Sequence, residues 1–191
     1  MDYAIYLAHT RVPTARLDQA RCEDMDLLQA ANFARAAAVN NVRHIVYLGG
    51  MIPQGNVSRT LLQSRNEVTE ELAGSGIAVT TIRCSLIVGP GSSAITLLDQ
   101  VVRRAPLLLV PMWALGKKQP ITLTDVMRAF HHCLGNEEMF GKSYDIGGPD
   151  ILTLADILEH GAHNHGRTSR VHVVKRFPKP LFKALVRLLS P

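Results

Sequence analysis

The stretch from Val79 to Gly91, VTTIRCSLIVGPG, constrains the fold more than any other part of the chain. It is rich in β-branched residues and ends at a Gly-Pro-Gly turn. A strand that is nearly continuous in apolar residues is typical of parallel sheets, whose crossover helices cover both faces. Ligands of such sheets bind beyond the carboxyl ends of the strands. We therefore expect a site near residues 84–93, with a plain core strand and tight turn as the alternative.

Similar patterns surround this strand. Tyr3–Ala8 and Arg43–Leu48 have the composition of buried strands, and Glu23–Val39 and Ser58–Ala73 have helical periodicity. The repeated order of strand, helix and strand predicts an α/β fold in which flanking helices cover one parallel sheet. After Gly91 we expect a helix capped by Ser92 or Ser93, followed by a loop or short edge strand at Pro106–Trp113. An extended segment Pro120–Leu123 then leads into a helix capped by Thr124. The last elements expected are a strand Ser143–Ile146 and a helix Leu154–His160 with the capping pair Thr153 and Asp156.

Charge is unevenly distributed along the chain. The formal net charge is +5, but seven basic residues and no acidic ones follow Glu159, so residues 1–159 carry 14 basic against 16 acidic residues. This distribution argues against a nucleic-acid-binding domain and assigns the excess positive charge to the C-terminal segment. Leu181–Leu189, flanked by basic residues, could lie on a membrane surface, although such a helix more often completes a core. We expect a cytoplasmic protein, because the first residues do not resemble a secretory signal.

Cysteines and histidines give little indication of metal or thiol chemistry. Cys22, Cys84 and Cys133 are scattered and include no Cys-x-x-Cys pair, which argues against a disulfide framework and a zinc module. The histidines lack carboxylates or thiolates at ligand spacing, so no metal site is expected. Cys84 lies in a predicted buried strand, where packing is favoured over nucleophilic catalysis. A phosphate-binding G-x-G-x-x-G turn is also absent from the sequence.

Six segments in order resemble the later part of an atypical short-chain dehydrogenase/reductase of the NmrA-like, epimerase-like kind. They are YLAH, NNVRHIVYLGG, LLQSRNEVTEEL, GIAVTTIRCSLIVGPGS, PITLTDVMRAF and GKSYDIGGPDILTLADIL, within residues 2–158. The resemblance implies a Rossmann-like domain. It also implies that the first strand here matches the family's fourth and that the leading glycine-rich β-α-β-α-β half is missing. We therefore expect a fragment, an incomplete gene model, or an engineered or degenerate product.

The resemblance also implies an altered catalytic pattern. The family's Tyr-x-x-x-Lys, in which the tyrosine transfers a proton and the lysine holds the ribose, matches Leu61 and Arg65 in this chain. Leucine cannot transfer a proton, whereas Arg65 could still hold a ribose hydroxyl. The serine that usually ends the preceding strand is replaced by Gly49 or Gly50. No catalytic residue is therefore assigned.

The positions that the resemblance assigns to binding lie on three strand ends and one helix. The implied cofactor, in a full-length parent, is NAD or NADP, and tight binding of it by this chain alone is not expected. Residues implied to line the nicotinamide and ribose are Leu7, Ala8, His9, Gly49, Gly50, Arg65, Cys84, Ser85 and Leu86. Ser92, Trp113 and Gln119 resemble positions on the side of an unknown small-molecule substrate.

Two functions follow from this reading. The first is an NAD(P)-binding protein from an oxidoreductase or epimerase family, with this chain not competent in catalysis by itself. The second is a non-catalytic NAD(P) sensor or protein-interaction scaffold, a homo-oligomer being possible in either case. We expect residues 1–160 to form a partial NAD(P)-binding domain and residues 161–191 to form a basic C-terminal segment that begins a substrate-side or interaction region.

Overall fold

A computed structural model describes residues 2–8, 22–51, 59–105, 107–166, 171–178 and 180, without the side chains of residues 22, 23, 59–65 and 93. By its internal contacts the chain divides into two compact units. The first contains residues 1–84 and 125–146, and the second contains residues 85–124 and 147–191. The domain boundary expected at residue 160 stays a prediction.

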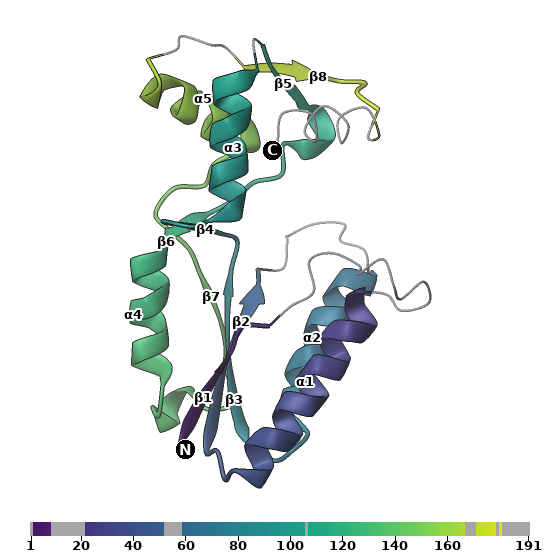
Figure 1. Ribbon diagram of the computed structural model, residues 1–191, viewed down its shortest axis with the longest axis vertical. Coiled ribbons are helices and arrows are strands. Elements are labelled where there is room, and N and C mark those ends of the chain that lie inside the picture. The colour runs from purple at the N-terminus through teal and green to yellow at the C-terminus, as the bar shows by residue number, and fades with distance from the viewer. Residues whose placement is uncertain are drawn as a thin grey trace. The chain divides into compact units, whose positions relative to one another are not determined.

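The first unit is built on a four-stranded parallel sheet in the order β1-β2-β3-β7 (Figure 1). Its strands are β1 (Tyr3–Tyr6), β2 (His44–Gly50), β3 (Ala78–Cys84) and β7 (Ser143–Ile146). The register pairs Tyr6 with Tyr47, Leu48 with Ile82, and Cys84 with Ile146. The parallel sheet predicted from the sequence is therefore confirmed, including the placement of Tyr6, Val46 and Ile82 in one layer.

Helices cover both faces of this sheet. The helices α1 (Cys22–Val39) and α2 (Arg59–Ala73) pack on one face, and Figure 1 shows α4 (Leu123–Cys133) on the other side. The short 3-10 helix η2 (Glu137–Met139) connects α4 to β7. The core between the sheet and α1 and α2 contains Tyr6, Ala30, Ala34, Ala37, Val42, Ile45, Tyr47, Val68, Leu72 and Val79.

The spacing of apolar residues predicts that one face of α1 packs inward, and its members are Leu27, Ala30, Ala31, Ala34 and Ala38. Ala30 and Ala34 are buried and Leu27 and Ala31 partly buried, but the prediction for Ala38 is wrong, since it is exposed and Ala37 is buried instead. The inward face is centred on Ala30, Ala34 and Ala37, which are four and three residues apart, and Ala38 lies about 100° further round the helix than Ala37. Asn41 adopts a left-handed φ of 54° just after the helix, a conformation that asparagine tolerates at helix ends.

The central apolar stretch forms two strands and not one. β3 ends at Cys84, and β4 (Leu86–Val88) pairs with β6 (Pro120–Thr122) in a separate two-stranded sheet. The break falls at Ser85, where the chain leaves the pairing with β2 and β7. Composition does not reveal such a break, because both pieces are equally rich in apolar and β-branched residues.

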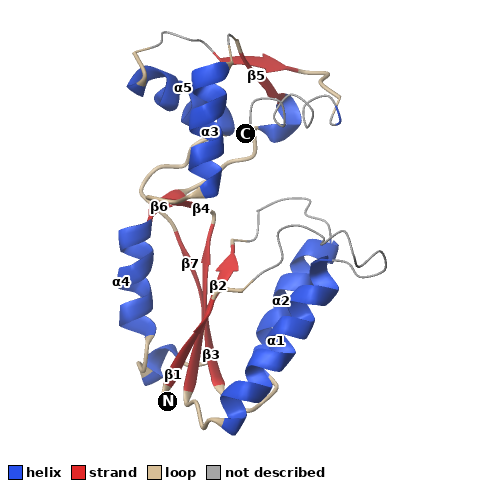
Figure 2. Cartoon of the chain, in the orientation of Figure 1, coloured by secondary structure: helices blue, strands red, loops and turns tan. Residues whose placement is uncertain are grey.

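The second unit combines two-stranded parallel pairs with helices (Figure 2). Besides β4 and β6 it contains β5 (Leu108–Pro111) paired with β8 (Val171–Val174), the helices α3 (Ser93–Arg104) and α5 (Leu154–Asn164), and the 3-10 helix η1 (Met112–Ala114). Its core is formed by Val102, Ala105, Leu108, Val110, Leu158 and Ala162. Gly161 allows close packing here, since a Cβ at that position would be 3.3 Å from Val102 Cγ2.

Helix ends in this unit test the capping predictions. Thr153 and Asp156 form the predicted capping box, and the Ser92 side chain accepts a hydrogen bond from the backbone N–H of Ile95. The predicted end of α5 at His160 is wrong, because the helix continues to Asn164. Thr124 was predicted to cap α4, but that helix already begins at Leu123, so Thr124 lies within its first turn.

None of the helices in the described residues is long and apolar enough to cross a membrane. The predicted amphipathic segment Leu181–Leu189 lies outside the described residues.

Candidate functional site

The carboxyl edge of the four-stranded sheet brings together three of the predicted strand ends. Leu7 and Ala8 follow β1, Gly49 and Gly50 end β2, and Cys84 ends β3. Gly50 pairs in register with Cys84, and the backbone N–H of Met51 donates to the Cys84 carbonyl oxygen at 2.9 Å. Because all of these strands are parallel, their carboxyl ends share one edge.

The side chains of the predicted residues described at this edge are small or apolar, whereas Arg83 and Asp145, in register with Gly49, are charged. Leu7 is 57% exposed, and the neighbouring Ala8 is also exposed. The two glycines leave the backbone of β2 without side chains at its end, so a planar ligand group can approach it closely. Among the described residues, Leu7, Ala8, Gly49 and Gly50 therefore offer an apolar surface and backbone groups and no side chain that could transfer a proton.

Two titratable groups at or near this edge, the Cys84 thiol and the Tyr6 hydroxyl, are held in their neutral forms. Burial raises the pKa of the Cys84 thiol, which disfavours the reactive thiolate. Burial, together with the nearby Asp26 and Tyr47, raises the pKa of Tyr6 to about 12. The Tyr6 hydroxyl is buried, and no hydrogen-bond partner for it is found within the described part of the chain. Neither group is suited to acid–base chemistry at neutral pH.

Several predicted site residues cannot be placed at this edge. His9 lies outside the described residues, and the side chains of Leu61 and Arg65 are also not described, although both residues belong to α2. Ser85 and Leu86 follow Cys84 directly in the chain and begin the second unit.

The three predicted substrate-side residues all belong to the second unit and have internal partners there. The Ser92 hydroxyl donates to the Ile87 carbonyl oxygen at 3.0 Å, in addition to its capping role. The Trp113 indole N–H donates to the Phe177 carbonyl oxygen at 3.1 Å, and the Gln119 amide donates to the Gly148 carbonyl oxygen at 2.7 Å. Trp113 as a whole residue is 47% exposed.

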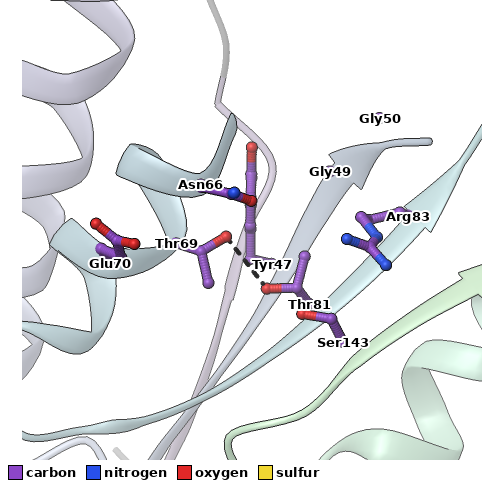
Figure 3. A pocket seen from close by; sticks show the side chains of 9 residues that line it. All are labelled: Tyr47, Gly49, Gly50, Asn66, Thr69, Glu70, Thr81, Arg83 and Ser143. Carbon is purple, nitrogen blue, oxygen red and sulfur yellow. Dashed lines mark hydrogen bonds between the residues drawn. The ribbon is translucent and has the colours of Figure 1, made fainter. Parts of the chain in front are cut away.

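A cavity of about 110 Å³ lies in the first unit between α2 and the sheet (Figure 3). Sequence reasoning identified only two of its lining residues, Gly49 and Gly50. The others are Tyr47, Asn66, Thr69, Glu70, Thr81, Arg83 and Ser143. The alternation of side chains along a strand could have indicated part of this lining. Tyr47 and Gly49 are two residues apart on β2, and Thr81 and Arg83 are two residues apart on β3, so the members of each pair lie on the same face of the sheet.

The groups around this cavity are polar and partly paired with one another. Arg83 Nε donates to Asp145 Oδ1 at 2.6 Å, and the Thr69 and Thr81 hydroxyls are 3.4 Å apart. Gly49 helps to create the space, because a Cβ there would lie 3.4 Å from Arg83 Cγ and 3.5 Å from Thr81 Cγ2. In the regions that the structure describes, no group of three or more His, Cys, Asp or Glu residues could hold a metal ion.

Comparisons with known proteins identify the fold. No family model matches the chain. The chain is similar to the UDP-N-acetylglucosamine 4-epimerase of Bacillus cereus, with a TM-score of 0.67 and 16% identity over 97% of this chain and 71% of the epimerase. It is also similar to the triphenylmethane reductase of Citrobacter sp. complexed with NADP(H), with a TM-score of 0.67 and 14% identity over 98% of this chain and 65% of the reductase.

A third solved structure, WbmH of Bordetella bronchiseptica in complex with NAD⁺, has a TM-score of 0.66 and 14% identity over 94% of this chain and 68% of that protein. The chain thus has the α/β, Rossmann-like fold of NAD(P)-dependent epimerases and reductases across most of its length. It spans about two thirds of each of these proteins.

One curated relative matches in sequence. The auxiliary protein GraX of Staphylococcus aureus is 30% identical over 81 residues, which are 42% of this chain and 23% of GraX. The chain therefore spans less than a quarter of that relative, and the match covers less than half of the chain itself.

Proposed function

We propose that this chain is an atypical short-chain dehydrogenase/reductase protein that forms the nicotinamide and ribose side of an NAD(P) site and does not catalyse a reaction by itself. The observation that carries the proposal is the shared carboxyl edge formed by Leu7 and Ala8, Gly49 and Gly50, and Cys84 on parallel strands. Solved proteins of the same fold are found with NADP(H) and NAD⁺. The edge of such a sheet is where ligands of this fold class bind.

The residues present fit one end of the cofactor better than the other. An apolar, glycine-containing edge suits the flat nicotinamide ring, and bound NAD(P) would supply hydride-transfer chemistry there. The pyrophosphate needs a glycine-rich turn that opens a helix, and the sequence contains no such motif. Arg65 is proposed to hold a ribose hydroxyl from the first turns of α2.

Catalysis is not part of the proposal, because the proton donor expected in this family is absent. Leu61 occupies the position of the tyrosine, and the raised pKa values of Cys84 and Tyr6 offer no replacement at neutral pH. The chain is therefore proposed to bind the nicotinamide end of the cofactor and to supply no proton donor for a reaction there.

Calorimetry with NADH, NADPH and nicotinamide mononucleotide tests this proposal. All three are expected to bind weakly, with dissociation constants on the order of 0.1–1 mM, because they share the nicotinamide end and lose the pyrophosphate contacts. ADP should give no heat. Gly50→Leu should abolish binding, whereas Gly116→Leu at an exposed position with open space around it should not. Absence of heat with all three nicotinamide compounds would rule the proposal out.

The second candidate function is a non-catalytic sensor or interaction scaffold. Leu61 in place of a proton donor favours it, and so does the similarity of 81 residues to a protein described as auxiliary. The test is turnover: the chain, or a longer version that contains it, should bind nicotinamide compounds and leave carbonyl and sugar-nucleotide substrates unchanged. A measurable rate that is lost in Arg65→Ala would eliminate the sensor in favour of an enzyme.

A further inference from the structure

The second unit carries the positive charge of the chain. It contains 11 basic and 4 acidic residues, whereas the first unit contains 10 basic and 12 acidic ones. One of the four acidic residues, Asp99, is already shared between Arg103 and His165. An excess of this size on one compact unit attracts anionic partners.

Large apolar side chains are exposed in this unit where β5 and β8 end. Met112 and Trp113 lie in η1 directly after β5 and are 49% and 47% exposed, and Val173 of β8 is 45% exposed. The hydrogen bond from the Trp113 indole N–H to the Phe177 carbonyl oxygen joins η1 to the segment that follows β8. Apolar side chains from both strand ends are therefore exposed close to one another.

Two basic side chains lie beside these apolar ones. Lys175 and Arg176 follow β8 directly, and both are exposed. Because β5 and β8 are parallel and Pro111 pairs with Val174, Met112 and Lys175 are the next residues of neighbouring strands. None of the ion pairs found among the described residues involves Lys175 or Arg176. We call Met112, Trp113, Val173, Lys175 and Arg176 the η1–β8 surface.

The combination of exposed apolar and basic side chains favours a lipid surface over an acidic protein. An anionic bilayer accepts apolar side chains at the boundary of headgroups and acyl chains and attracts lysine and arginine to its phosphates. Tryptophan is enriched at that depth. The amino-acid sequence after β8 continues the same combination, since residues 175–189 contain five basic residues, four leucines and no acidic residue.

We propose that the η1–β8 surface binds reversibly to a membrane surface that contains anionic phospholipids. Met112 and Trp113 enter the boundary between headgroups and acyl chains, and Lys175 and Arg176 lie beside the lipid phosphates. Each basic side chain near such a surface strengthens the partition about fivefold. The contact is peripheral and needs no membrane-spanning helix.

Fluorescence of the 191-residue chain tests the proposal, because Trp113 is its only tryptophan. With vesicles of equal parts phosphatidylglycerol and phosphatidylcholine, the emission should move to shorter wavelength. Lipids brominated near the headgroup end of their acyl chains should quench it. Vesicles of phosphatidylcholine alone should cause no change, and about 0.5 M NaCl should reverse the response, since salt screens exposed charges.

Two pairs of variants locate the surface. Arg176→Gln should weaken the partition about fivefold, whereas Arg35→Gln, the same change at an exposed residue of α1 in the first unit, should leave it unchanged. Met112→Ser should weaken it about tenfold through the loss of buried apolar area. Met127→Ser is its control, at a residue of α4 that is 60% exposed.

Several results would overturn the proposal. One is vesicle binding, followed by flotation, without a change in Trp113 emission, because the contact would then lie on another segment. Others are equal effects within either pair of variants, equal responses to neutral and anionic vesicles, and no binding to either. Poly-L-glutamate represents an acidic protein, and a Trp113 response to it as strong as to the anionic vesicles would exclude the lipid assignment.

This experiment is independent of nicotinamide binding. The η1–β8 surface belongs to the second unit, whereas the carboxyl edge of β1, β2 and β3 belongs to the first. Either proposal can therefore fail while the other stands.

Discussion

The two units of the chain are stabilised in different ways. In the first unit, four strands hydrogen-bond in one parallel sheet whose central side chains, Ile45, Val46 and Ile82, are at most 1% exposed. In the second unit, the strands form separate pairs, and glycines at Gly148 and Gly161 allow close approach of neighbouring elements. The first unit should therefore be most sensitive to loss of core volume, and the second to added volume and to loss of helix caps.

The largest effect is expected for Ile45→Ala in the first unit. The side chain is fully buried, and its truncation leaves a cavity in a packed core, so the free energy of unfolding should fall by about 3–4 kcal/mol. Urea unfolding followed by circular dichroism measures this change. Ile5→Ala, at a position 40% exposed, should cost much less. Equal losses from the two variants would contradict the description of a core centred on β2 and β3.

Gly148→Ala should have the next largest effect, in the second unit. A Cβ at this position would lie 2.1 Å from the Pro120 carbonyl oxygen, and backbone cannot move away as a flexible side chain can. Added volume of this kind costs about 2–3 kcal/mol. Gly116→Ala adds the same methyl group into open space in the same unit and is the control. In Gly148→Ala, native-state hydrogen exchange should show faster exchange of backbone amides in α3, α5 and β5. Faster exchange confined to β2 and β3 would contradict the claim that the second unit is the one sensitive to added volume.

Thr153→Ala tests the contribution of a helix cap. Thr153 and Asp156 exchange three hydrogen bonds of 2.7–3.2 Å, and these bonds lower the pKa of Asp156. Removal of the threonine hydroxyl should reduce stability by about 1 kcal/mol. Thr124→Ala is the matched control, since Thr124 lies inside α4 and its side chain is exposed. A loss at Thr124 as large as at Thr153 would show that the sequence-based capping prediction for α4 was right.

The smallest effect expected is a pH dependence carried by His44 in the first unit. His44 is fully buried, its Nε2 is 2.9 Å from Thr80 Oγ1, and its Nδ1 accepts from the Gly135 backbone N–H at 3.3 Å. This arrangement assigns the proton to Nε2, which donates to Thr80 Oγ1, and the Thr80 hydroxyl in turn donates to the Met139 carbonyl oxygen at 2.6 Å. Burial lowers the pKa of His44 from its usual 6.5.

The sign of this effect follows from proton binding. Below pH 6.5 the unfolded chain binds a proton at this histidine that the folded chain resists, so stability is lost as the pH falls from 6.5 toward the lower folded pKa. NMR titration of the histidine ring carbons measures it directly. The His44 ring should remain neutral as the pH falls just below 6.5, and protonation of this ring in the folded chain at or above pH 6.5 would contradict the network.

The sequence predicts the first unit better than the second. The strands around Tyr6, Val46 and Ile82 have uninterrupted apolar patterns, and those patterns suffice to predict a parallel sheet and the convergence of its carboxyl ends. The break at Ser85 could not be predicted, because it depends on which neighbour each strand pairs with and not on composition. The cavity was missed for a related reason: Asn66, Glu70 and Ser143 come from separate elements, and only the folded chain brings them together.

The strand pattern predicted a site near residues 84–93, whereas most of the individual binding residues were predicted through resemblance. Gly49, Gly50 and Cys84 do lie on one edge, yet Ser92, Trp113 and Gln119 have internal hydrogen-bond partners that sequence spacing cannot reveal. Polar residues in loops commonly hydrogen-bond to nearby backbone groups, and the same residue types also bind ligands. The sequence alone does not distinguish the two roles.

The most direct test of the account is the position at which nicotinamide mononucleotide perturbs the amide spectrum of the isotopically labelled chain. Shifts at Leu7, Ala8, Gly49, Gly50 and Cys84, with no response to ADP, are the predicted result. Shifts restricted to the second unit, or a response to ADP as strong as to the mononucleotide, would contradict the claim that the carboxyl edge of this sheet holds the nicotinamide end of the cofactor.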